Sequence, residues 1–215
     1  MQQMDNQHTK TPVSDMESFF EIRDGNGVLL SISQLSENQS SKNGLSYEYK
    51  DGQLESIKEY SNGVESVIVA TFKGNEMTQY EHGNKVYVGN YTGSYKDGFH
   101  RNGAGQEFDI TGTRLIYHGN FVNDERDGNG YFYDAGRIRY KGKWMHGIPQ
   151  GEGTIYNDDG FPLESGILEN GYLKSNKGYY YYKTGQIERS CFPSCLPHWG
   201  DRKKKLKRTM SFYFC

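Results

Sequence analysis

Three residues near the C-terminus are of types that can be zinc ligands: Cys191, Cys195 and His198. A structural zinc site needs four such ligands, usually two pairs that a short turn holds together. Here one His follows two Cys, and no fourth ligand stands nearby. The pattern therefore favours an irregular segment over a metal centre, and we expect neither a metal nor another cofactor.

The other candidates for chemistry are residues that also favour turns. The Gly-x-Gly triplets that begin at Gly103, Gly128 and Gly151 are not followed by the Gly-Lys-Ser/Thr of a phosphate-binding loop. The acidic segment 123–128 lacks the alternating ligands and the closing Glu of a calcium loop. The histidines lie mostly in or beside turns, without the His-x-x-x-His spacing of a zinc enzyme; they are His8, His82, His100, His118, His146 and His198. We therefore expect no catalytic residues and no enzyme activity.

A compact basic run lies close to the C-terminus. Its cationic residues are Arg202, Lys203, Lys204, Lys205, Lys207 and Arg208. Such a run is compatible with a solvated tail, with a nuclear-import signal, or with attachment to anionic phospholipid. Each basic residue near an anionic membrane contributes about 1 kcal/mol of attraction, and the aromatic residues Trp199, Phe212 and Phe214 flank the run. The sequence leaves these three alternatives open.

The composition limits the class of protein. Only 34% of the 215 residues are hydrophobic, and the chain holds 18 Tyr, 11 Phe and 27 Gly. This balance favours a thin sheet, in which aromatic rings cover the glycines of the strands. It argues against a two-layer fold with an aliphatic core. A net charge of −2 predicts no nucleic-acid partner. Because the chain shows neither a long apolar run nor a signal peptide, we expect a soluble cytoplasmic protein.

An internal repeat organises the chain. Its best copy reads Tyr140-x-Gly142-x-Trp144, followed by a turn at Gly147 and then Gly151-x-Gly153. Earlier copies begin at Tyr91 and Tyr117, and a degraded copy begins at Glu164, so the period is 23 to 26 residues. A fixed period in this range indicates a repeat architecture.

This repeat resembles the MORN (membrane occupation and recognition nexus) family, whose motif is Tyr-x-Gly-x-Trp, two residues, Gly, and then Gly-x-Gly. The resemblance implies an elongated, single-layer, twisted antiparallel sheet of stacked β-hairpins. It also implies a role as an interaction or scaffolding module, often beside a separate effector domain, and some relatives are linked to phospholipids.

The spacing of turns divides the chain into five parts. We expect disorder in residues 1–17, a hairpin and loop in 18–44, and divergent half-repeats in 45–86. The repeat array covers 87–185, and an irregular, basic tail covers 186–215. Because side chains alternate along a strand, Tyr140, Gly142 and Trp144 are predicted on one face and Lys141 and Lys143 on the other.

The aromatic stripe is the predicted interaction surface. Its rings either pack over glycines within the sheet or leave part of the trough open to a protein partner. The candidate partner-binding residues are Tyr91, Tyr95, Tyr117, Phe121, Tyr140 and Trp144. We therefore expect a non-enzymatic scaffold that binds a protein.

Two other functions remain open. In one, the sheet itself binds phospholipid; in the other, the chain is a regulatory fragment of a MORN-containing methyltransferase or lipid kinase. The residues after the array are too few for either catalytic domain. The exposed end strands of an open sheet are also compatible with a homodimer.

Overall fold

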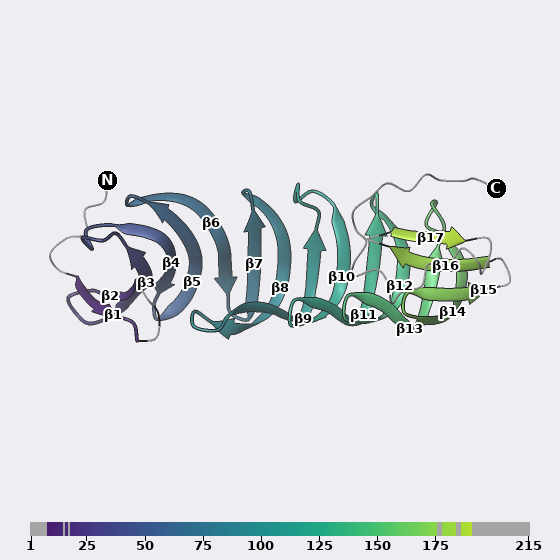
Figure 1. Cartoon of the computed structure of the whole chain (residues 1–215), viewed down its shortest axis with the longest axis horizontal. Coiled ribbons are helices and arrows are strands. Elements are labelled where there is room, and N and C mark those ends of the chain that lie inside the picture. The colour runs from purple at the N-terminus through teal and green to yellow at the C-terminus, as the bar shows by residue number, and fades with distance from the viewer. Residues whose placement is uncertain (1–7, 15, 17, 176–177, 184–185, 191–215) are drawn as a thin grey trace.

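The computed structural model describes residues 8–14, 16, 18–175, 178–183 and 186–190. These residues form one long antiparallel sheet without a helix, in which each strand pairs with the next one along the chain (Figure 1). The prediction of an elongated all-β sheet of consecutive hairpins is confirmed. The strands are β1 (Thr9–Pro12), β2 (Phe19–Arg23), β3 (Leu29–Leu35), β4 (Lys42–Lys50), β5 (Gln53–Ser61), β6 (Val64–Lys73), β7 (Glu76–Glu81), β8 (Asn84–Ser94), β9 (Gly98–Phe108), β10 (Leu115–Val122), β11 (Glu125–Asp134), β12 (Arg137–Met145), β13 (Ile148–Tyr156), β14 (Pro162–Glu169), β15 (Tyr172–Ser175), β16 (Gly178–Lys183) and β17 (Gln186–Ser190).

Seven of the described hairpins close through two residues with positive φ, the geometry that matches the twist of paired strands. Asn62–Gly63 and His146–Gly147 are examples, with φ of 50° and 80° in the first and 50° and 76° in the second. At residues 123–124 the second position is Asp124, with φ of 69°. An Asp therefore occupies the place where the repeat has a glycine.

The N-terminal segment departs from the expected disorder. Thr9–Pro12 pairs with β2, in a register that runs from Thr9 opposite Arg23 to Pro12 opposite Phe20. Polar composition alone predicts disorder, but the outer edge of β2 offers backbone groups that a short Thr-rich strand can pair with. The predicted hairpin that follows is confirmed as β2 and β3.

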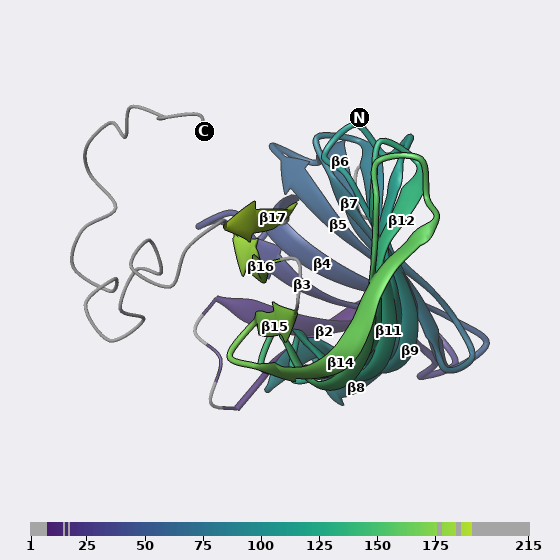
Figure 2. The same ribbon diagram turned by 90° about the vertical axis from the view of Figure 1, so that its right-hand side faces the viewer.

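The sheet is curved, and its concave side holds the core (Figure 2). Strands β15–β17 run crosswise in front of β12–β14 in Figure 1, and β17 contacts β12. The end of the array is thus covered by the last strands of the same sheet. The irregular tail was predicted for 186–215, but residues 186–190 form strand β17, which pairs with β16. Residues 191–215 lie outside the described residues.

Seven glycines lie side by side across β8–β14. Each pairs with the next across the sheet; they are Gly89, Gly105, Gly119, Gly130, Gly142, Gly153 and Gly166. Tyrosine rings lie over this row, so a methyl group on Gly105 would come within 2.5 Å of the ring of Tyr87. The glycines are therefore needed to make space for the rings.

The tyrosines define one recurring contact. The hydroxyl groups of Tyr87, Tyr117 and Tyr140 each donate to the backbone carbonyl three residues later, at 2.8, 3.0 and 2.9 Å. Tyr87 therefore opens the first structural copy, and the sequence-based start at Tyr91 was wrong by four residues. The two starts cannot be told apart in sequence, because an aromatic residue and a glycine alternate from Tyr87 to Tyr95.

Successive copies are joined at their turns. The backbone amides of Asp124, Gly147 and Gly171 donate to carbonyl groups of the preceding copy, at 3.1, 2.9 and 3.0 Å. The acceptors are Arg101, Arg126 and Pro149. These bonds fix each hairpin against its neighbour.

Candidate functional site

Four of the six predicted partner-binding rings belong to the core. Tyr117 and Tyr140 are 0% exposed, Phe121 is 1% exposed and Trp144 is 2% exposed. Tyr117 contacts Phe121 and Trp144 edge-on, with ring centroids 5.1 and 5.2 Å apart. This burial gives these four rings a packing role, because a partner could reach them only if the sheet opened. Lys141 and Lys143 are exposed on the opposite face, as predicted.

The other two predicted rings, Tyr91 and Tyr95, are only partly buried. They join a second aromatic cluster, made with Phe99 of β9 and with rings from strands that precede the repeat. Tyr95 lies 6.0 Å from Tyr47, and Tyr91 lies 5.0 Å from Phe72 and 5.8 Å from Phe99. Of the six predicted rings, only Tyr91 and Tyr95 are therefore accessible to a partner, and they lie at this end of the concave face.

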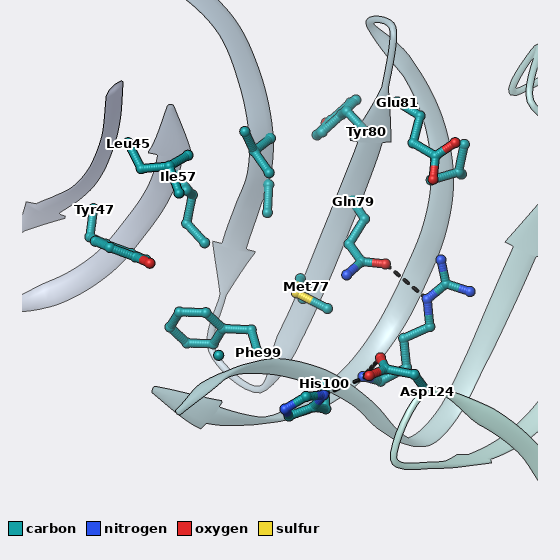
Figure 3. A pocket seen from close by; sticks show the side chains of 15 residues that line it. Leu45, Tyr47, Ile57, Met77, Gln79, Tyr80, Glu81, Phe99, His100 and Asp124 are labelled. Atoms are coloured by element: carbon teal, nitrogen blue, oxygen red, sulfur yellow. Dashed lines mark hydrogen bonds and ion pairs between the residues drawn. The ribbon is translucent and has the colours of Figure 1, made fainter. Parts of the chain in front are cut away.

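A pocket of about 610 Å³ adjoins the second cluster (Figure 3). Its apolar wall comes from successive strands of the N-terminal half: Leu45, Tyr47, Ile57, Val69, Ala70 and Met77. Phe99 of β9 also lines the pocket. Apolar walls with a few polar groups are typical of a surface that binds another molecule.

The polar rim of the pocket is held in place by hydrogen bonds (Figure 3). Arg101 donates through Nε to Oε1 of Gln79 at 2.8 Å. Nδ1 of His100 lies 2.6 Å from Oδ2 of Asp124, whose other oxygen accepts from the Arg101 backbone amide at 2.8 Å. The turn residue Asp124 thus ties the second copy to the rim of the pocket.

The hydrogen bond with Asp124, together with the charge of that carboxylate, raises the pKa of His100. Burial raises the pKa of Tyr87 to about 12, and it raises the pKa of Tyr117 and Tyr140 as well. The three phenols therefore stay neutral at physiological pH, as donors to backbone carbonyls require.

A partly buried charge ladder runs from the pocket along the core. Glu107 accepts from Nε of Arg126 at 2.9 Å and lies 3.9 Å from Nη1 of Arg101. Arg101 lies over the ring of Tyr87 at 4.7 Å, and Arg126 lies over Tyr117 at 4.9 Å. Each arginine therefore covers the tyrosine of its own copy, a cation–π arrangement that adds to ring burial.

The sequence analysis missed the pocket and the ladder. Arg101 and Arg126 both lie two residues before a Gly-x-Gly triplet. This equivalent position in two copies of the repeat is a sequence signal that could have indicated the ladder. Pro149 takes this place in the third copy and is fully buried. The apolar wall had no comparable signal, because its residues come from strands outside the clear repeats.

Among the residues that the structure describes, no group of three or more His, Cys, Asp or Glu side chains could hold a metal ion. Within those same residues no helix has the length and apolar character to cross a membrane. The basic run, from Arg202 to Arg208, and the segment with Cys191, Cys195 and His198 lie outside the described residues.

Comparisons with known proteins do not identify the chain. No protein-family model matches it, and no curated protein matches it either. One solved structure, "ASR Alternansucrase in complex with isomaltononaose", is similar at 15% sequence identity and a TM-score of 0.26. The match covers 84% of this chain but only 13% of that one, a likeness too slight to bear on function.

Proposed function

We propose that this chain is a non-enzymatic, MORN-type repeat scaffold that binds a protein partner on its concave face. The observation that carries this proposal is the pocket of about 610 Å³, with an apolar wall and a polar rim, beside partly exposed Tyr91 and Tyr95. Partly exposed aromatic residues beside an apolar surface are typical anchors in protein interfaces.

The rigidity of the rim supports a binding role. Hydrogen bonds fix Arg101 and Asp124 before a partner arrives, so little side-chain entropy is lost when they contact one. The MORN resemblance supports the same proposal through the Tyr-x-Gly-x-aromatic repeat, in which Tyr117 and Tyr140 make the same hydrogen bond. We place this interaction in the cytoplasm.

Affinity isolation with the full chain and two variants tests the proposal. Tyr95→Glu places a charge beside the pocket, whereas Lys143→Glu changes an exposed residue on the convex face. We expect proteins that the wild type retains to be lost with Tyr95→Glu and kept with Lys143→Glu. Equal retention by both variants would contradict binding at the concave face.

A separate experiment tests the alternative that the chain binds phospholipid. Co-sedimentation of the full chain with anionic and neutral vesicles is compared between the wild type and a variant with all six cationic residues of 202–208 changed to Gln. If the variant still binds vesicles, and if Tyr95→Glu and Lys143→Glu retain the same proteins, the function would be lipid binding by the sheet itself.

A further inference from the structure

Strand β6 is paired on both sides along only part of its length. Residues 70–73 pair with β7, from Ala70 opposite Gln79 to Lys73 opposite Glu76. In the described structure, residues 64–69 pair with β5 alone, because β7 continues through Tyr80 and Glu81 beside β8. Figure 1 shows β6 bending away from β7 toward its N-terminal end. Six of the ten residues of β6 therefore form a free edge inside the sheet.

Two β-bulges explain this separation. The register of β5 with β6 shifts between Ile57 and Lys58 and again between Glu59 and Tyr60. A bulge adds a residue to one strand, bends it and increases its twist. Two of them within a few residues turn β6 out of the plane that β7 and β8 share. The result is an edge that carries unpaired backbone N–H and C=O groups.

The free edge is unusually apolar for a surface strand. Val64 is 59% exposed, and Val67 and Ile68 are each 39% exposed. Its one charged residue, Glu65, is paired with Lys58 at 2.8 Å. Proteins ordinarily protect such edges with lysine, proline or a covering segment. This edge has no such protection in the described structure.

The separation between the strands opens into the pocket. Val69 and Ala70 of β6 and Tyr80 and Glu81 of β7 all line the pocket. Backbone groups of the edge and the apolar wall are thus available to the same bound segment. No ion pair in the described part of the chain involves Glu81, so its carboxylate can receive a positive charge from outside.

We propose that residues 64–69 of β6 pair with an extended segment of a partner protein. This segment places one apolar side chain in the pocket and a Lys or Arg beside Glu81. Strand addition supplies affinity through main-chain hydrogen bonds, while pockets for alternate side chains supply selectivity. The inference rests on the proposed function, and it specifies the form and chemistry of the partner.

Synthetic peptides test this inference. The probe is a fluorescein-labelled ten-residue peptide of alternating Val and Thr with one central Lys. One matched peptide has Glu in place of Lys, and a second is N-methylated at alternate residues, which removes strand pairing. We expect the full chain to bind the Lys peptide in fluorescence anisotropy. The N-methylated peptide should bind at least about tenfold more weakly, the effect of a loss of 1.4 kcal/mol.

Two variants locate the binding. Val67→Lys should weaken binding of the Lys peptide about tenfold, whereas Val28→Lys, at a position 47% exposed before β3, should leave it unchanged. Glu81→Lys should reverse the preference, so that the Glu peptide binds better than the Lys peptide. Equal binding of the N-methylated peptide, or binding indifferent to both Val67→Lys and Glu81→Lys, would overturn the inference.

Hydrogen exchange gives an independent readout at the backbone. The amides of residues 64–69 should exchange rapidly in the full chain and slow when the Lys peptide is added. Protection that rises with protein concentration would assign the edge to a second copy. Slow exchange in the dilute chain alone would assign it to another segment of the same chain. Either result overturns the inference, while loss of protein retention with Tyr95→Glu would still support the proposed function.

Discussion

Gly142→Ala should be strongly destabilising, although it adds only one methyl group. A Cβ atom at residue 142 would lie 2.6 Å from both the carbonyl oxygen of Glu152 and the Cα of Gly153. It would also meet the hydroxyl group of Tyr140. An ordinary contact begins near 3.4 Å, so either the strands separate or the tyrosine ring leaves its position.

The expected loss has two parts. Forcing an extra methyl group into a packed site costs about 1–3 kcal/mol. Displacement of Tyr140 also breaks its 2.9 Å hydrogen bond to the carbonyl of Lys143, at a cost of about 1 kcal/mol. Together they lower the free energy of unfolding by about 2–4 kcal/mol, which lowers the melting temperature of a chain of this size by about 4–16 °C.

Thermal melting followed by near-ultraviolet circular dichroism measures this effect. Lys143→Ala is the matched control, because this exposed residue is on the same strand and its loss should change stability by less than about 0.5 kcal/mol. If Gly142→Ala melted within about 2 °C of the Lys143→Ala variant, the close packing of rings over glycines would not stabilise the sheet.

Three further predictions concern charges and pKa values. Arg126→Met and Glu107→Gln should each destabilise the chain, and a double-mutant cycle in urea should give a coupling of about 0.5–3 kcal/mol; additive effects would contradict a shared ion pair. In an NMR titration His100 should have a pKa above its ordinary value of 6.5, and Asp124→Asn should lower it. Because that pKa is raised on folding, the stabilisation is present below pH 6.5 and is lost as the pH rises through the folded-state pKa; a stability difference from Asp124→Asn that grew toward high pH would contradict this sign. In ultraviolet titration Tyr87, whose pKa is raised to about 12, should ionise later than exposed tyrosines, and the stability it contributes should fall as the pH rises above about 10. A normal pKa for this tyrosine in the folded chain would contradict its burial.

The fold followed closely from sequence because turn chemistry and repeat spacing agree. Pairs such as Asn62–Gly63 and His146–Gly147 favour hairpins wherever they occur, and the period fixes how the hairpins stack. Alternation along β12 also predicted which face is buried. The phase of the first copy was not predictable, since Tyr87 and Tyr91 both begin an aromatic-x-Gly-x-aromatic pattern.

The candidate site was predicted less completely. The sequence pointed to a row of rings but could not show that Tyr140 and Trp144 are covered by neighbouring side chains, while Tyr91 and Tyr95 stay partly exposed. That difference depends on curvature, which tertiary contacts set. The free edge of β6 was equally hidden, because bulges arise from mismatched pairing of two strands and leave no fixed residue signal.

Site-specific photocrosslinking tests the proposed binding at the concave face most directly. A photoreactive phenylalanine analogue replaces Tyr95 beside the pocket or Lys143 on the convex face, in the full chain expressed in cells. We predict a discrete crosslinked protein from position 95 and none from position 143. Crosslinking from position 143 alone, or crosslinks only to lipid from position 95, would contradict a protein-binding concave face.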